Sequence, residues 1–142
     1  MKKLASILAL IIIVPVLMAA YPLPAPSDGY IPGGLISTGN SQDATVIKSS
    51  AGILGYIFAT NVNASPMYLK IYDKATTPTS SDTPKIRMLI PGSTTGSGNN
   101  MPIPLYGARF SSGISFRIVT TSPDSGNTGV AAGEVILNYG YK

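Results

Sequence analysis

The chain has 142 residues and a formal net charge of +4, half of which comes from Lys2 and Lys3, so the rest of the chain is only weakly basic. It contains neither cysteine nor histidine, which excludes disulfides, thiolate chemistry, the usual general base and the commonest metal ligand. The remaining cations are scattered and are not interleaved with aromatic residues, so we expect no nucleic-acid partner.

The first 20 residues form a hydrophobic segment that can direct the chain to a membrane. An apolar run from Leu4 to Ala20 follows directly behind the two lysines. As a helix its 17 residues would rise about 25 Å, slightly less than a hydrocarbon core of about 30 Å. The side chains predicted to contact lipid are Leu4, Ile7, Leu8, Ile11, Ile12, Val14 and Leu17.

Two interpretations of this segment stay open, a retained membrane anchor and a cleaved signal peptide. Signal peptidase prefers small residues at positions −1 and −3, yet cleavage after Ala19 or Ala20 would place Leu17 or Met18 at −3. This poor cleavage site favours a retained N-terminal hydrophobic helix with its two lysines on the cytoplasmic side.

Residues 21–43 are rich in proline and glycine and separate the hydrophobic segment from the rest of the chain. The prolines that alternate from Pro22 to Pro26 favour an extended spacer of about 3 Å per residue. The apolar residues Tyr30, Ile31, Leu35 and Ile36 are not needed in a plain spacer. The segment is therefore predicted to be either a disordered linker or an arm that orders on a neighbouring subunit.

Residues 44–142 alternate between apolar and polar positions and are interrupted by turn-forming residues, the pattern of short β-strands. Clear alternation predicts strands at residues 44–48, 52–61, 67–73, 85–90, 113–120 and 134–141. Residues 101–106 contain two prolines and predict an edge strand. No helical period follows residue 20, so the sequence predicts an all-β domain, an antiparallel β-sandwich of which the jelly roll is one form.

The alternation also predicts which side chains point outward. In residues 52–61 it places Leu54, Tyr56 and Phe58 on one face and Ile57 on the other. In residues 67–73 it places Met67, Leu69 and Ile71 inside and Tyr68, Lys70 and Tyr72 outside. The inward positions predicted in residues 85–90, 113–120 and 134–141 are Ile86, Met88 and Ile90, then Ile114, Phe116 and Ile118, and finally Val135, Leu137 and Tyr139. Because tyrosine is favoured at protein interfaces, Tyr68, Tyr72 and Tyr106, together with Tyr30, Ile31 and Leu35, are candidate contact residues. Ordinary packing within the sheet is the alternative.

No arrangement of residues in the chain predicts a catalytic centre. The acidic residues stand at no motif spacing, and serine and threonine lack an activating histidine. Asp73, Asp82 and Asp124 fall at strand ends or in loops, where aspartate caps turns through its side chain, a calcium site being the alternative. We therefore expect no enzyme, no cofactor and no metal.

Four short segments carry a family resemblance: YLKIYDKA at 68–75, DTP at 82–84, ARFSSGI at 108–114 and GVAAGEV at 129–135. Through them residues 46–142 resemble a loosely defined family of small β-sandwich proteins encoded in bacteriophage genomes. The resemblance implies a virion structural or surface-decoration protein. The chain departs from that family in its hydrophobic segment, which favours a virus with a lipid membrane or a secreted host protein of similar fold.

Together these features predict a non-enzymatic structural protein of a virion, tethered to a membrane through residues 4–20. Its expected partners are other capsid subunits and further copies of itself in an oligomer or lattice. The alternative is a secreted or cell-surface adhesin, a receptor-binding sandwich whose signal peptide is cleaved. A hydrolase built on Asp73, Asp82 or Asp124 is a third, weaker interpretation.

Overall fold

The computed structural model describes residues 29–39, 43–96 and 98–142, and these residues form two four-stranded sheets. The strands are β1 (Ile31–Ile36), β2 (Thr45–Lys48), β3 (Gly52–Asn61), β4 (Met67–Asp73), β5 (Ile86–Ile90), β6 (Asn99–Phe110), β7 (Ile114–Val119) and β8 (Val135–Tyr141). Every pair of neighbouring strands is antiparallel. The predicted all-β class and antiparallel pairing are therefore confirmed. The predicted N-terminal helix lies outside the described residues.

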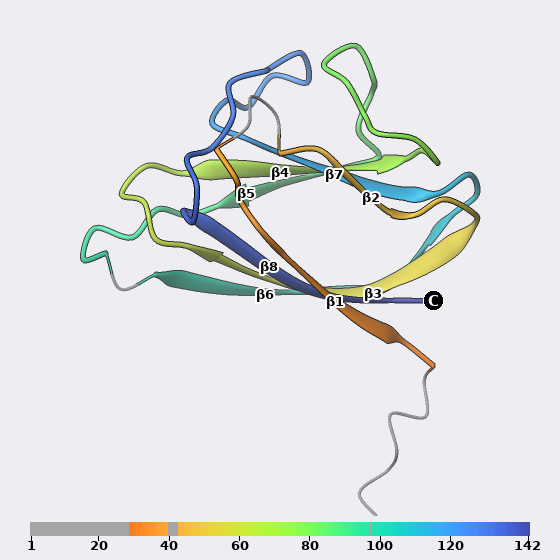
Figure 1. Cartoon of the computed structure of the whole chain (residues 1–142). Helices are drawn as coiled ribbons and strands as arrows, with labels where there is room; N and C mark the ends of the chain where they lie inside the picture. The colour runs from red at the N-terminus through yellow and green to blue at the C-terminus, as the bar shows by residue number, and fades with distance from the viewer. Residues whose placement is uncertain (1–28, 40–42, 97) are drawn as a thin grey trace, which may run out of the picture.

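The strands pair like one long β-ribbon that is folded over on itself (Figure 1). Along this ribbon β1 pairs with β8, β2 with β7, β3 with β6 and β4 with β5. The additional pairs β3/β8 and β4/β7 produce the strand orders β1-β8-β3-β6 and β2-β7-β4-β5. Every connection except that between β4 and β5 crosses from one sheet to the other, which ties the two layers together.

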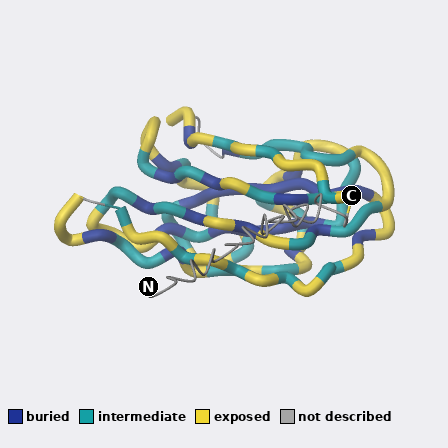
Figure 2. Tube along the Cα trace, turned by 90° about the horizontal axis from the view of Figure 1, so that it is seen from below, coloured by how far each residue is buried: buried dark blue, intermediate teal, exposed yellow. Residues whose placement is uncertain are grey.

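One apolar core, to which both sheets contribute, lies between the layers. Its fully buried members include Leu54, Ile57, Leu69, Ile71, Phe116, Ile118 and Leu137. Buried and exposed positions alternate along the strands, as Figure 2 shows. The predicted inward positions of β4, β5, β7 and β8 are confirmed, because all of them belong to this core or pack against it.

The alternation predicted along β3 is wrong because the strand contains a β-bulge. Between Leu54 and Tyr56 the chain advances by two residues while β8 advances by one, from Tyr141 to Gly140, so Gly55 is an extra residue relative to β8. Relative to β6 the extra residues lie on β6, between Pro104 and Ala108. A bulge inverts the alternation beyond it. Leu54 and Ile57 consequently both face the core, whereas Tyr56 and Phe58 face solvent and are 36% and 51% exposed.

β1 corrects the predicted start of the β-domain, which lies before residue 44. The strand pairs with β8 along its whole length, from Ile31 opposite Tyr141 to Ile36 opposite Ile136. Leu35 packs against the core, and the ring of Tyr139 fits over Gly33, which has no side chain to obstruct it. The apolar residues of the predicted arm are thus used within the chain's own sheet.

β6 occupies an edge of its sheet, as its two prolines predict. Pro102 lies opposite Phe58 and Pro104 opposite Tyr56. Because proline has no backbone N–H, it is suited to a strand with a neighbour on one side only. The strand extends farther on both sides than the predicted 101–106.

Candidate interaction surfaces

An uncharged, largely apolar surface covers the outer side of the β1-β8-β3-β6 sheet beyond the bulge; we call it the apolar face. The register of the four strands assigns to it Pro32, Ile36, Tyr56, Phe58, Pro102, Pro104 and Ile136. Its other positions are Gly34 and Gly140 and the uncharged residues Thr60, Asn100 and Asn138. Ile36 and Phe58 are more than half exposed. Within the described residues, every strand pair runs inside one of the two sheets, so no further strand crosses this face.

Tyrosine rings lying over glycines shape the apolar face. Tyr56 is the direct partner of Gly140 across the β3/β8 pair, and its ring occupies the space where a Cβ of residue 140 would stand. The ring of Tyr30 lies over Gly55 in the same way. The ring centroids of Tyr30 and Tyr56 are 6.5 Å apart and those of Tyr56 and Phe58 are 5.7 Å apart. The result is a row of three aromatic side chains fixed on the sheet.

The structure separates the predicted contact residues into three groups. Ile31 and Tyr106 are exposed, Ile31 to 52%. Tyr30, Tyr68 and Leu35 are half-buried, with Leu35 packed against the core. Tyr72 is only 1% exposed, so its prediction as an outward contact residue is wrong. Sequence reasoning missed Phe58, since the bulge that turns Phe58 outward leaves no signal except Gly55 itself.

Tyr106 combines high exposure with an unfavourable backbone. Its side chain is 93% exposed, the largest fraction among the exposed large hydrophobic residues of the described part. Its φ of 49° lies in the left-handed region, which costs a bulky L-residue about 1–2 kcal/mol. It stands where β6 passes the bulge of β3, two residues after Pro104 of the apolar face. A strained and exposed aromatic residue of this kind is typical of a contact site.

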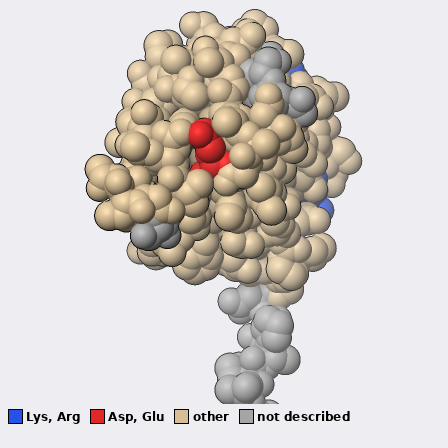
Figure 3. Space-filling model, turned by 60° about the vertical axis from the view of Figure 1, so that its left-hand side comes forward, with Lys and Arg blue, Asp and Glu red and all other residues tan. Residues whose placement is uncertain are grey.

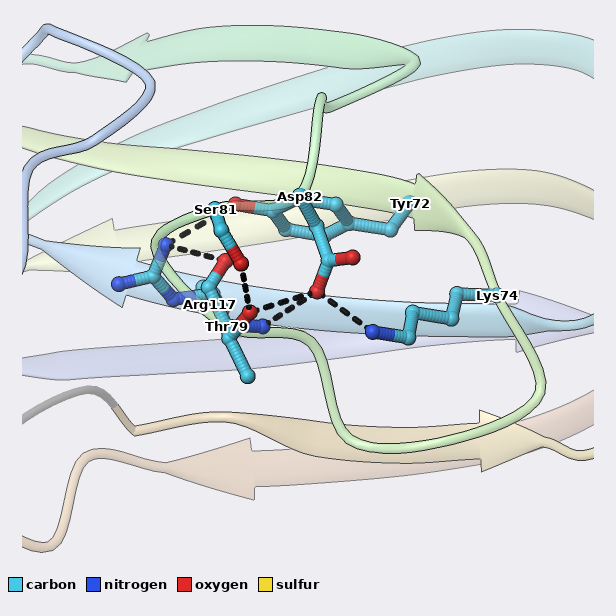
Figure 4. A network of polar contacts seen from close by, with 6 residues as sticks. All are labelled: Tyr72, Lys74, Thr79, Ser81, Asp82 and Arg117. Carbon is cyan, nitrogen blue, oxygen red and sulfur yellow. Dashed lines mark hydrogen bonds and ion pairs between the residues drawn. The ribbon is translucent and has the colours of Figure 1, made fainter.

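In the other sheet, two loops cover the outer side of β4 and β7, whereas the outer positions of β5 are exposed. Arg117 of β7 is completely buried there and donates from Nη1 to the Tyr72 hydroxyl and to Thr79 O. From Nη2 it donates to Gly126 O and to the Asn127 side chain. Figure 4 shows how this guanidinium ties the 74–85 connection to the sheet. Lys70 and Tyr72, which were predicted to point outward, are therefore buried with Arg117 beneath these loops in spite of correct alternation.

Lys70 is a second buried cation under these loops. Its Nζ donates to the carbonyl oxygens of Pro123 and Asp124. Burial, and then the nearby charge of Arg117, lower the pKa of Lys70, while burial raises the pKa of Tyr72. Both cations are held mainly by carbonyl oxygens, so they join the loops to the sheet and leave little of this side for a partner.

Of the three aspartates that were predicted to cap turns, Asp73 and Asp82 do so. Asp73 accepts hydrogen bonds from the backbone N–H groups of Ser111 and Ser112 and from Lys85 Nζ. Although burial by itself would raise it, these bonds hold the pKa of Asp73 well below its ordinary value. The pKa of Asp82 falls to about 2 because Lys74 and the N–H of Thr79 donate to its carboxylate.

Asp124 pairs with Arg87 instead of capping a turn. Among the residues that the structure describes, no three acidic, histidine or cysteine side chains come together in a way that could hold a metal ion.

Charge is distributed unevenly between the two ends of the domain. Lys48, Lys74, Lys85, Arg109 and Lys142 lie at one end, where β2, β4, β6 and β8 finish and β1 begins; we call it the basic end. The opposite end carries Asp43 and Glu134 and, within the described residues, no lysine or arginine. Figure 3 looks towards that opposite side and shows a red acidic patch, with blue only at the rim.

The residues predicted to contact lipid, Leu4, Ile7, Leu8, Ile11, Ile12, Val14 and Leu17, lie outside the described residues. In the part of the chain that the structure does describe, no helix has the length and hydrophobicity required to cross a membrane. No protein-family model matches the chain, and no curated protein matches it significantly. The resemblance to bacteriophage β-sandwich proteins therefore stays a prediction.

Proposed function

We propose that this chain is a non-enzymatic structural protein of a virion, which residues 4–20 tether to a lipid membrane and which assembles through its apolar face. The apolar face carries the proposal. It joins the aromatic pair of Tyr56 and Phe58 to an uncharged surround, and aromatic residues without charged neighbours are the composition of interface centres.

The fold supports the same function. We infer that the two stacked sheets form a β-sandwich of the jelly-roll type, because eight strands paired as a folded ribbon in two four-stranded sheets are its pattern. Jelly rolls build many viral capsids, but they also occur in lectins and in cupins. Since a fold by itself does not dictate function, the apolar face and not the topology carries the argument.

The occupant of the apolar face that we propose is a second copy of this chain. Two copies of an uncharged face meet without the like-charge repulsion that opposes the self-association of charged surfaces. The strands β1 and β6, at the two edges of this sheet, have backbone groups that no further strand covers within the described residues, and assembly shields such edges. A β-domain of this size, built without disulfides, also gains stability from association.

The test compares the full chain in detergent with two matched variants by sedimentation velocity. Phe58→Glu places a charge at the centre of the apolar face, and Leu89→Glu places the same charge at a 49% exposed apolar residue of the other sheet. We expect Phe58→Glu to dissociate the oligomer and Leu89→Glu to leave it intact. A monomeric wild-type chain, or equal behaviour of the two variants, would refute the role of the apolar face.

The virion itself provides the second test. The protein should be present in purified particles, and deletion of residues 4–20 should remove it from them. Its absence from particles would contradict the proposed function whatever its oligomeric state.

A secreted or cell-surface adhesin is the alternative function. The exposed residues 94–96, between β5 and β6, favour it because an exposed loop at the end of a rigid β-domain is a common place for ligand binding. Intact-mass measurement of the native protein separates the two. A mature chain that begins after Ala19 or Ala20 would support the adhesin, and a retained segment supports the tether.

A further inference from the structure

The basic end lies where the β-domain connects to the hydrophobic segment. β1 begins at Ile31 opposite Tyr141, so the chain reaches the domain beside β8 and the end of β6. Nine residues, 21–29, separate Ala20 from Tyr30. A stretch of nine residues spans at most about 32 Å. If residues 4–20 lie in a bilayer, the basic end is the part of the domain that is held nearest to its surface.

The cations of the basic end differ in their partners. Lys74 is paired with Asp82 and Lys85 with Asp73. Lys48 and Arg109, by contrast, belong to none of the ion pairs among the described residues. Their charges are therefore available to an external anion.

An open groove of about 590 Å³ lies at this end, and its lining includes Lys85, Arg109 and Lys142 but no acidic side chain. Lys142 Nζ is 4.6 Å from the centroid of the Tyr30 ring. Tyr30 and the highly exposed Tyr106 add the residue type that prefers the boundary between lipid and water. Cations with flanking tyrosines are the composition that binds an anionic lipid surface.

We propose that the basic end docks on the surface of a membrane that contains anionic lipids, with phosphate headgroups in the groove beside Arg109. The domain then rests on the bilayer, and its acidic end and the apolar face remain open to neighbouring subunits. This inference rests on the proposed membrane tether and specifies the lipid class that the tethered domain recognises. The tether raises the effective concentration of the lipid surface, so a few cations suffice for docking.

The absence of cysteine allows a site-specific test with the full chain. Single variants Ser50→Cys, between β2 and β3 at the basic end, and Thr94→Cys, at the opposite end, each carry an environment-sensitive fluorophore. Both residues are exposed, so the label is not expected to disturb the fold. The labelled chains are inserted into vesicles of phosphatidylcholine, with or without phosphatidylglycerol, that contain a nitroxide quencher on a fraction of the headgroups.

We expect quenching of the label at residue 50 to increase at least twofold when phosphatidylglycerol is present, and the label at residue 94 to be quenched weakly in both vesicles. Lys48→Gln with Arg109→Gln should lower the ratio of docked to undocked protein about tenfold to thirtyfold. The matched control Asn99→Asp with Ser65→Asp changes the net charge equally at the opposite end and should have little effect. High salt should weaken docking, because it screens exposed charges.

Each other outcome overturns the inference in a distinguishable way. Flotation of the vesicles in a density gradient shows whether the chain is attached to them. Equal quenching at residue 50 in both kinds of vesicle, from a chain that floats with the vesicles, rejects the docking and leaves the tether intact. Failure to float with either vesicle rejects the tether and the docking together. A free oligonucleotide can also be added to the labelled chain without vesicles. If it changes the fluorescence of the label at residue 50 as strongly as the anionic vesicles do, the basic end is assigned to nucleic-acid phosphates.

Discussion

The ring of Tyr56 lies over Gly140, its direct partner across the β3/β8 pair. Glycine at residue 140 therefore makes room for a side chain of another strand, because the Tyr56 ring fills the space that a side chain at residue 140 would need. Tyr30 over Gly55 and Tyr139 over Gly33 repeat the arrangement, and Tyr139 does so on the inner side of the sheet. Glycines that would ordinarily weaken a strand are thus covered by aromatic rings.

The first prediction concerns Gly140→Ala. The added methyl group would overlap the Tyr56 ring, so the ring must swing away from the sheet, at a cost of about 1–3 kcal/mol. Chemical denaturation measures this loss, and tyrosine fluorescence reports the displaced ring. Gly34→Ala is the matched control, because its nearest neighbours stand 3.6 Å from the new atom. Its effect should stay within about 0.5 kcal/mol. Equal effects of the two substitutions would contradict the account of the tyrosine rings.

The second prediction concerns Asp73→Asn. The carboxylate joins the end of β4 to the turn between β6 and β7, and an amide can replace only part of its acceptor capacity. We expect a loss on the order of 1–3 kcal/mol in the free energy of unfolding. Ser111→Ala removes a single hydroxyl donor to the same carboxylate and should cost less. A larger effect of Ser111→Ala would show that the turn does not depend on Asp73.

The third prediction is a loss of stability in acid. The pKa values of Asp73 and Asp82 are lowered in the folded chain, so the folded state binds fewer protons than the unfolded state. Their contribution is fully present above the ordinary aspartate pKa of about 3.9. It is lost as the pH falls from there, for Asp82 towards its folded pKa of about 2. Denaturation midpoints measured between pH 6 and pH 2 should fall less for Asp73→Asn than for the wild type. Parallel curves would contradict this linkage.

The fourth prediction concerns Arg117→Lys. One ammonium group cannot reach both Thr79 O and Gly126 O, which the guanidinium bridges beneath the two loops. An unpaired carbonyl is left beneath the loops, and we expect a loss of about 1–3 kcal/mol. Arg87→Lys is the control, since its pair with Asp124 is exposed, and its denaturation midpoint should not change. Hydrogen exchange should increase in residues 76–84 of the Arg117 variant alone.

Some of the fold follows from local pattern and some does not. Alternation along β4 and β7 predicted the inward positions Leu69 and Phe116 correctly, because burial on one side of a strand repeats every second residue. The same alternation misplaced Tyr56, since one extra residue at Gly55, relative to β8, reverses the faces beyond it. It placed Tyr72 correctly on the outer side but did not show that Tyr72 is buried there, because alternation along a strand carries no information about the loops that Arg117 holds over it at Thr79 and Gly126.

The sequence by itself determined the class of this protein: a hydrophobic N-terminal segment, no cysteine or histidine, and a β-rich remainder with alternating strands. These are properties of composition and of short-range order. Only the tertiary structure decided that β1 belongs to the β-domain, that Tyr56 and Phe58 form an outer aromatic row, and that the cations Lys48 and Arg109 gather at one end. Each of these depends on strand register between segments far apart in the chain, which no local pattern encodes.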